Sequence, residues 1–241
     1  MTPQRNLALR TLVVIPALNE EPNLGPTVAE LAAVVPRGDI LVVDDGSADG
    51  TIAAARALGL AVASHAVNLG AGGGAQTGFF YARLHGYEAA VQHDADGQHD
   101  PAFIPVLVAA LAAGEADVAI GSRYLRRGGY RSGFLRRAGI WFFSLVTSVL
   151  AGQRFTDVTS GQRAFNRRAM DMLARNFPTE YPDAEAVLAM KKSGLRVREI
   201  AVTMRPRRFG QSKTTALRTL SYPAKSLVAV LVEALRRGLR P

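Results

Sequence analysis

The fold is decided by the stretch LVVIPALNEEPNLG at residues 12–25, in which an apolar run closes at a proline and a charged segment follows. A continuous apolar run of this length is typical of a strand buried on both faces of a parallel sheet. The NEE triplet at 19–21 then precedes a helix, expected to run to about Val35, because Pro22 suits a first helical turn. The segment therefore predicts the first strand and helix of an α/β protein.

The same alternation continues along the chain. We expect further strands at 40–45, 60–64, 88–96, 117–124 and 197–202. We expect further helices at 51–58, from a glycine-rich loop at 70–74 to about residue 84, after Pro101, over 138–153, at 183–193 and from about residue 216. Strands that alternate with helices predict a mostly parallel central sheet flanked by helices.

Composition narrows the class of protein. The chain has 241 residues, of which 48% are hydrophobic and 20% charged, which is the profile of a globular protein. We find no internal repeat or low-complexity linker, so we expect a single domain over 1–241. The absence of cysteine excludes disulfides, cysteine-ligated zinc and thiol nucleophiles.

Charge divides unevenly between the two halves of the chain. Residues 1–120 hold five arginines and thirteen acids, a net charge of −8, whereas residues 121–241 hold 24 basic residues and seven acids, a net charge of +17. An acidic half can hold a metal ion, and a basic half suits an anionic partner. The alternative is that the arginines are simply solvated.

The uncharged stretch 138–153 is too short to predict a membrane span. It has 16 residues, with Arg136 and Arg137 before it and Arg154 after it, whereas a span needs about 18 or more apolar residues. We expect an interfacial or buried helix instead. The opening residues, MTPQRNLALR, do not resemble a signal peptide.

The sharpest chemical signal is HDADGQHDP at 93–101, which follows an apolar strand. Two carboxylates one residue apart at a strand end, Asp94 and Asp96, can share Mg²⁺ or Mn²⁺, and Gln98 can add a third oxygen. The alternative is that these acids only cap a turn. For His93 and His99 we favour local packing or hydrogen bonding over metal ligation.

The glycine-rich stretch NLGAGGGAQTGF at 68–79 contains the G-x-G-x-x-A spacing of a dinucleotide-binding loop. An oxidoreductase is disfavoured because this loop follows the third strand instead of the first. The acids that follow are also a doublet, which suits a metal better than one ribose. Gly70 and Gly72 would still allow a phosphate or ribose to approach the backbone closely.

Seven motifs, in order, resemble family 2 glycosyltransferases, and within them the dolichyl- or polyprenyl-phosphate sugar synthase branch. They are VIPALNEE (14–21), VVDDGSADGT (42–51), NLGAGGGAQTGF (68–79), HDADGQHDP (93–101), IGSRY (120–124), TSGQRAFNRRAM (159–170) and RRFGQSK (207–213). The resemblance implies a GT-A fold, a nucleotide-sugar donor, Mg²⁺ or Mn²⁺, and inversion at the anomeric carbon. It also implies three parts: a nucleotide- and metal-binding part at 1–124, an acceptor-binding part at 125–215, and a terminal helix at 216–241.

Residue roles follow from the same resemblance and from the chemistry above. The expected donor-binding residues are Pro16, Asn19, Glu20, Asp44, Asp45, Gly70, Gly72, Asp94 and Arg208. The expected metal ligands are Asp94, Asp96 and Gln98. The expected catalytic residues are Asp96, Arg123, Asp157 and Lys213, and the expected acceptor-binding residues are Arg136, Arg137 and Ser160. One departure is Gln162, where the family often has an aromatic residue.

Two acceptor classes remain open. A phosphate acceptor is already an anion and needs little base assistance, whereas a sugar or small-molecule hydroxyl needs a base, for which Asp157 is the best candidate. We favour polyprenyl phosphate, with the protein cytoplasmic and peripheral to the inner face of the membrane, where a small integral membrane partner is conceivable.

A basic module that binds membrane or nucleic acid is a third hypothesis. The basic half lacks interleaved aromatic residues, so we expect no nucleic-acid partner.

Overall fold

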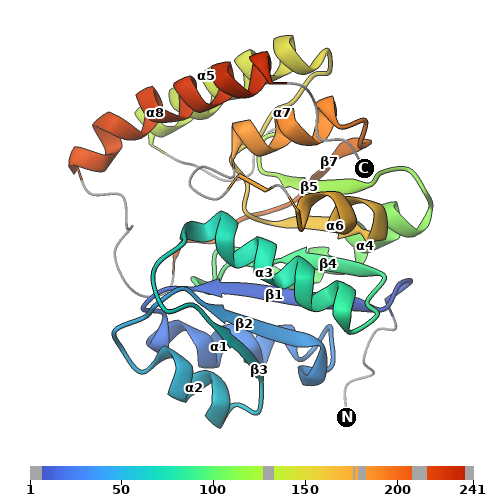
Figure 1. Cartoon of the computed structure of the whole chain (residues 1–241), viewed down its shortest axis with the longest axis vertical. Helices are drawn as coiled ribbons and strands as arrows, with labels where there is room; N and C mark the ends of the chain where they lie inside the picture. The colour runs from blue at the N-terminus through green and yellow to red at the C-terminus, as the bar shows by residue number, and fades with distance from the viewer. Residues whose placement is uncertain (1–6, 127–132, 176, 179–182, 208–215, 237–241) are drawn as a thin grey trace.

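A computed structural model gives the structure of the chain and describes residues 7–126, 133–175, 177–178, 183–207 and 216–236. At residues 135–136 and 216–224 it describes the backbone alone. A seven-stranded sheet runs through the molecule, with helices on both faces and two long helices stacked beyond one of them (Figure 1). The predicted α/β class is therefore confirmed.

The sheet has the strand order β3-β2-β1-β4-β6-β5-β7. Its strands are β1 (Thr11–Ala17), β2 (Ile40–Asp44), β3 (Ala61–Ser64), β4 (Ala89–Gln92), β5 (Val118–Ser122), β6 (Arg163–Asn166) and β7 (Val197–Ala201). All neighbouring strands pair in parallel except β6, which is antiparallel to both β4 and β5. The mostly parallel sheet was predicted, but β6 and the helix after it were missed.

The helices divide between the two faces. They are α1 (Glu21–Leu31), α2 (Thr51–Ala57), α3 (Gly70–Leu84), α4 (Ile104–Ala112), α5 (Phe134–Ala151), α6 (Arg167–Leu173), α7 (Ala184–Lys192) and α8 (Ala216–Leu235), with 3-10 turns η1 (Arg37–Asp39) and η2 (Pro101–Phe103). Helices α1 and α4 contribute to the core on one face, and α3, α6 and α7 to the core on the other. Helices α5 and α8 both pack against α7 and lie side by side (Figure 1).

Strand β1 explains why a continuous apolar run was needed. Leu12 and Val14 belong to one core, and Val13 and Ile15 belong to the other, because successive side chains of a strand point to opposite faces. None of the four is more than 1% exposed. The central strand is thus buried on both sides.

The expected loop at 70–74 is instead the beginning of α3. A Cβ atom at Gly78 would lie 2.5 Å from Val14 Cγ1, and one at Gly74 would lie 3.1 Å from Pro16 Cβ. The glycines therefore allow α3 to pack closely on β1, a helix-packing role that the sequence pattern does not distinguish from phosphate binding.

Three expected boundaries also differ. Helix α1 ends at Leu31 instead of about Val35, and the apolar helix begins at Phe134 instead of residue 138. Strand β4 ends at Gln92, so Asp94 and Asp96 lie in the loop that follows it. No helix in the described part of the chain combines the length and the apolar character that crossing a membrane would require.

Asp117, just before β5, forms hydrogen bonds that link β5 to the segments next to β6 and β7. Its carboxylate accepts hydrogen bonds from the Arg196 backbone N–H (2.9 Å), Arg196 Nη2 (3.0 Å), Arg168 Nη1 (3.2 Å) and Asn166 Nδ2 (2.9 Å). Burial raises the pKa of Asp117, but the hydrogen bonds from Arg196 and Asn166 and the charge of Arg196 outweigh it, and the pKa falls to about 2. The carboxylate is therefore ionised through the physiological range.

Asp117→Asn should lower the free energy of unfolding at pH 7 by about 1–3 kcal/mol, the range for charge-assisted hydrogen bonds to a buried acceptor. A folded-state pKa below the ordinary 3.8 stabilises the fold fully above about pH 4 and less as the pH falls toward 2, so the difference between variant and wild type should shrink over that interval. Urea denaturation at several pH values measures both effects. Asp171→Asn, which disrupts a more exposed pair with Arg83, is the matched control and should change stability little.

Candidate active site

The candidate site lies where the carboxyl ends of β1, β2, β4 and β5 meet at one edge of the sheet. In the order β3-β2-β1-β4, β1 and β4 are neighbours while the chain passes between them through β2 and β3, so this edge is a topological switch point. Ligands of open α/β sheets bind in the crevice at such points. The carboxyl ends of β1 and β2 and the loops after β1, β2 and β4 carry most of the predicted donor-binding and metal-binding residues.

The loops after β1 and β2 are tied to each other. The Asn19 backbone N–H donates to Ser47 Oγ (2.9 Å), and Asn19 Oδ1 accepts from the Ala48 N–H (2.8 Å). The Glu20 N–H donates to Thr51 Oγ1 (2.9 Å). Asn19 has a φ of +53°, a left-handed conformation that asparagine tolerates better than most residues. These hydrogen bonds hold the loop after β1 against the loop after β2.

Asp44 presents a buried acceptor at the end of β2. The residue is 1% exposed, and its Oδ2 accepts from the Ser47 N–H at 3.3 Å. Its Oδ1 is buried and has no hydrogen-bond partner among the described residues. A ligand N–H such as that of a nucleotide base would satisfy this oxygen, and leaving it unpaired is costly.

The neighbouring Asp45 is engaged differently. Its carboxylate accepts from the Leu69 N–H (2.8 Å) and the Gly70 N–H (2.9 Å), and its Oδ1 lies 2.8 Å from His65 Nδ1. It therefore holds the amino end of α3, where N–H groups lack helical partners. The Gly70 N–H is occupied by this contact, and Gly72 is buried within α3.

The loop after β4 brings two carboxylates to the crevice. The Asp96 side chain is 8% exposed and the Asp94 side chain 40%. Asp94 Oδ2 lies 3.1 Å from Nε2 of the buried His99. A Cβ atom at Gly161 would lie 2.5 Å from Asp94 Oδ2, so the glycine lets the 159–161 turn approach this carboxylate.

Electrostatics favour a cation beside these acids. Burial raises the pKa of Asp96, and the negative charge of Asp94 adds to it. Burial also raises the pKa of Asp94, but the hydrogen bond and charge of His99 outweigh it, and that pKa is lowered. Burial lowers the pKa of His93 to about 3, so His93 is neutral and contributes no countercharge.

The oxygen atoms of Asp94 and Asp96 suit a metal ion that a bound substrate also helps to coordinate. Among the residues that the structure describes, no three His, Cys, Asp or Glu side chains converge as a metal cage. Mg²⁺ and Mn²⁺ are, however, commonly held by one or two carboxylates together with substrate phosphates. Asp94 and Asp96 fit that arrangement. The Gln98 side chain instead donates to the carbonyl of Arg205 (3.4 Å).

Arg207 was not assigned a role from the sequence, although it opens the RRFGQSK motif. Its Nη2 lies 2.9 Å from Asp96 Oδ2, and its Nη1 lies 3.9 Å from Glu20 Oε1. Two residues expected near it, Arg208 and Lys213, lie outside the described residues. Arg207 thus places a positive charge against the acids of two loops, Glu20 after β1 and Asp96 after β4.

Arg123 and Asp157 form a buried ion pair. Arg123 Nε and Nη2 donate to the two carboxylate oxygens at 2.6 and 2.7 Å, and the Arg123 N–H also donates to Asp157 (3.0 Å). Glu199 holds the turn that carries Asp157 by accepting from the N–H groups of Thr156 (2.8 Å) and Asp157 (2.7 Å). No sequence motif indicated a role for Glu199, a charged residue in strand β7.

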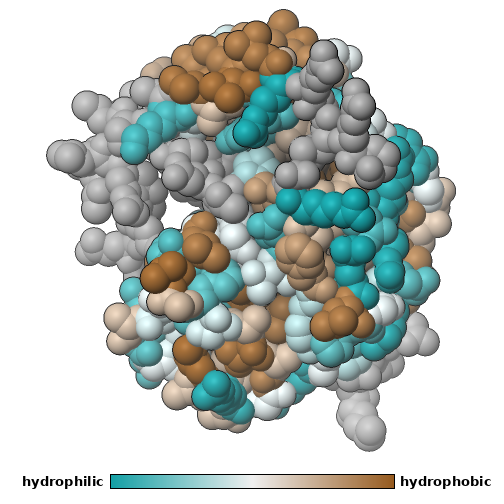
Figure 2. All heavy atoms as spheres, viewed as in Figure 1, coloured by the Kyte–Doolittle hydropathy of each residue, from teal (hydrophilic) through white to brown (hydrophobic). Residues whose placement is uncertain are grey.

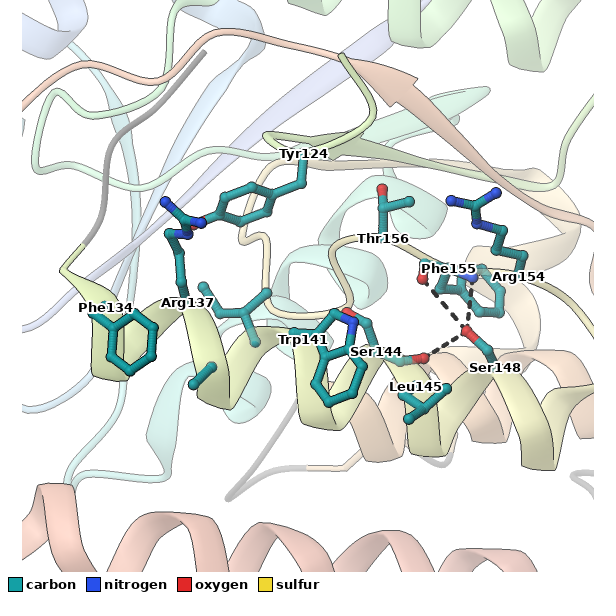
Figure 3. Close-up of a pocket in the computed structure, with 12 residues that line it drawn as sticks. Tyr124, Phe134, Arg137, Trp141, Ser144, Leu145, Ser148, Arg154, Phe155 and Thr156 are labelled. Atoms are coloured by element: carbon teal, nitrogen blue, oxygen red, sulfur yellow. Dashed lines mark hydrogen bonds between the residues drawn. The ribbon is translucent and has the colours of Figure 1, made fainter. Parts of the chain in front are cut away.

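A pocket of about 720 Å³ lies along α5 (Figure 3). It is lined by Tyr124, Phe134, Arg137, Ala138, Ile140, Trp141, Ser144, Leu145, Ser148, Arg154, Phe155 and Thr156. Figure 3 shows Arg137 rising from α5 toward Tyr124 at one end and Arg154 at the other. The side chain of Arg136 lies outside the described residues, and Ser160 is 1% exposed, with no hydrogen-bond partner for its Oγ among them.

These features define a class of protein. The mostly parallel sheet with its topological switch point, the buried unpaired Asp44 oxygen and the carboxylate doublet in the loop after β4 fit a glycosyltransferase of the GT-A fold. The family model described as "Glycosyl transferase family 2" matches residues 12–173. The chain belongs to this family, as its motifs predicted, and it is an enzyme.

Relatives and a solved structure agree with this assignment. An undecaprenyl-phosphate mannosyltransferase of Micrococcus luteus is 34% identical over 214 residues, covering 85% of this chain and 87% of the relative. A polyprenol monophosphomannose synthase of Mycolicibacterium smegmatis is 36% identical, covering 85% and 80%. Glucosyl-3-phosphoglycerate synthase of Mycobacterium tuberculosis, in complex with Mn²⁺, UDP-glucose and phosphoglyceric acid, shares the fold with a TM-score of 0.72 at 22% identity, covering 94% and 80%.

Gly161→Ala should impair the site while sparing the fold, because the added methyl group would displace the Asp94 carboxylate. We expect donor turnover to fall about tenfold or more, as small misplacements of catalytic groups commonly cost. Gly38→Ala, where a Cβ meets nothing within 4 Å, is the control and should keep wild-type turnover. Nucleotide-sugar hydrolysis and thermal unfolding measure the two properties. Wild-type turnover in Gly161→Ala would contradict the close approach.

Proposed function

We propose that this enzyme transfers a sugar, with inversion and with a divalent metal, from a nucleotide-sugar donor to polyprenyl phosphate. The observation that carries the acceptor class is the state of Asp157. This candidate base is fully buried, and Arg123 engages both of its oxygens. A carboxylate held in this way is a poor general base. An acceptor that is already an anion needs none.

The donor half of the proposal rests on the crevice. Asp44 Oδ1 would accept from the base, and Pro16, Asn19 and Glu20 would line the nucleotide. Asp94 and Asp96 would hold Mg²⁺ or Mn²⁺. When bound, such an ion neutralises negative charge that develops on the departing diphosphate.

In the proposed reaction an acceptor phosphate oxygen attacks the anomeric carbon from the face opposite the diphosphate. The new carbon–oxygen bond forms as the bond to the diphosphate breaks, so the configuration inverts and the nucleoside diphosphate leaves with the bonding pair. No proton has to be removed from an ionised phosphate. We assign Asp157 the role of orienting Arg123 toward the donor phosphates, with Lys213 and Arg208 as further cations.

The acceptor half rests on the pocket along α5. Its ends carry the cations Arg137 and Arg154 (Figure 3), and its floor is apolar, including the buried Ile140 and Phe155. An anionic head joined to a hydrocarbon tail matches that combination of charged ends and apolar floor. Arg136 and Ser160 complete the proposed acceptor site.

The outer faces of α5 and α8 support peripheral attachment to a membrane. Trp141 is 66% exposed and Leu235 89% exposed. Other exposed apolar residues of the two helices are Phe134, Phe142, Leu145, Val149, Leu150, Val228, Leu231 and Val232. Figure 2 shows hydrophobic side chains gathered at the top of the molecule, over these helices. Amphipathic helices of this kind lie in a membrane interface, here the cytoplasmic one, where an integral membrane partner would add a second anchor.

The proposed function is tested by supplying the purified protein with polyprenyl phosphate and a panel of nucleotide sugars. The panel begins with GDP-mannose, because both relatives named above are mannose transferases. We expect metal-dependent formation of a lipid-linked sugar of inverted configuration. EDTA or Asp96→Asn should lower the rate at least about a hundredfold, because the carboxylate doublet loses its ion or a ligand. Faster transfer to a free sugar or peptide hydroxyl would favour the alternative acceptor class.

Arg137→Gln should reduce transfer to polyprenyl phosphate about tenfold while leaving the donor dissociation constant unchanged, because Arg137 lies at the acceptor pocket and away from the donor loops. Steady-state kinetics with each substrate varied separate the two effects. The control is Arg198→Gln, which removes an exposed arginine paired with Glu115 outside the pocket. Equal loss of donor affinity in Arg137→Gln would contradict the assignment.

Membrane attachment is tested separately by flotation of the wild-type protein with anionic vesicles. Binding of the protein to the vesicles should weaken as the salt concentration rises, because salt screens the attraction between charges.

A further inference from the structure

Arg207 is held against two nearly buried acids. Its side chain is 25% exposed, whereas those of Asp96 and Glu20 are 8% and 9% exposed. Pairing charges away from water costs desolvation, so such a pair often adds little to stability. Removing one partner of such a pair is nevertheless costly, because the other charge is then left buried and unpaired. A cation beside Asp96 and Glu20 is therefore favourable whether or not a metal ion is bound.

The contact falls on one particular oxygen of Asp96. Asp96 Oδ1 accepts the backbone N–H of Gln98 at 3.0 Å. Arg207 Nη2 lies 2.9 Å from the other oxygen, Oδ2. A divalent ion that took Oδ2 as a ligand would meet an oxygen that already pairs with the guanidinium, and the two positive charges would repel each other. The two cations would therefore contend for the same oxygen.

We propose that the guanidinium of Arg207 is a built-in counterion of the metal site, which neutralises Asp96 in the metal-free enzyme and competes with the divalent ion for it. The inference rests on the proposed function, in which Asp96 is a metal ligand. Competition by a tethered cation weakens metal binding until donor phosphates supply further ligands. Arg207 thereby couples metal binding to donor binding.

The inference predicts the sign of a binding effect. In Arg207→Gln the acids lose their counterion, so they should bind Mn²⁺ more tightly in the absence of nucleotide. We expect the Mn²⁺ dissociation constant to fall about tenfold, comparable to the effect of one nearby charge on an ionisation equilibrium. An arginine that served only as a donor ligand would leave Mn²⁺ binding unchanged in this experiment.

The chain offers a matched control in the same segment. Arg205 pairs with Glu30 Oε2 (3.0 Å) and Asp100 Oδ2 (2.8 Å), and no contact to Asp96 is found among the described residues. Arg205→Gln removes the same charge and should change the dissociation constant by less than about twofold, because the side chain is 42% exposed and screened. Arg207→Lys keeps the charge and should lie closer to wild type than Arg207→Gln does.

The measurement is titration of each full-length variant with Mn²⁺ alone, with free Mn²⁺ followed by electron paramagnetic resonance. Circular dichroism verifies that each variant is folded. If Arg207→Gln does not fold, Arg207→Met, which keeps an apolar side chain of similar length, takes its place. Tighter binding in Arg207→Gln and wild-type binding in Arg205→Gln would support the inference. Equal or weaker binding in Arg207→Gln and Arg207→Met would overturn it and leave the metal site standing. No saturable Mn²⁺ binding in any variant, wild type included, would overturn both.

Discussion

Buried negative charge at the carboxyl edge of the sheet is the constraint on which the rest of the site depends. Parallel strands bring their carboxyl ends to one edge, so Asp44 at the end of β2 and Glu20 and Asp96 in the loops after β1 and β4 gather there. Acids taken out of water must be paired or hydrogen-bonded. The loops meet this demand with backbone N–H groups and with Arg207, and within the described part of the chain Asp44 Oδ1 is left without a partner, as the proposed contact to a donor base requires.

The same constraint changes the meaning of the charge asymmetry along the sequence. The basic second half suggested an anionic partner, but several of its arginines form ion pairs with acids of the first half. Arg168 and Arg196 bind Asp117, Arg198 binds Glu115, Arg205 binds Glu30 and Asp100, and Arg207 binds Asp96. Strands β6 and β7, which come from the second half, lie on either side of β5 from the first. These five arginines therefore pair within the protein, and we look for cations that meet a partner at the α5 pocket, among them Arg137 and Arg154.

Sequence reasoning succeeded where a local pattern has one physical outcome. Continuous apolar runs such as 12–16 give buried parallel strands, and acids that follow them arrive at the ligand edge. It failed where the outcome depends on a distant partner. The glycines of α3 pack against β1, a distant strand, and the four-residue β6 is recognisable as a strand only through its pairing with β4 and β5. Glu199 and Arg207 escaped notice for the same reason, since their partners lie 42 or more residues away.

The Arg123–Asp157 pair shows how packing limits the chemistry available to the crevice. Bidentate pairing fixes the Arg123 guanidinium against the Asp157 carboxylate, and Glu199 holds the turn that carries Asp157 by accepting from its N–H groups. Freeing Asp157 to accept a proton would leave the Arg123 guanidinium, 4% exposed, without its counterion, which is costly. Base catalysis at this position would therefore have to overcome the stability of the site itself. A phosphate acceptor avoids that cost, because its nucleophilic oxygen is ionised before it arrives, and the arginine can stay in place as an oriented positive charge.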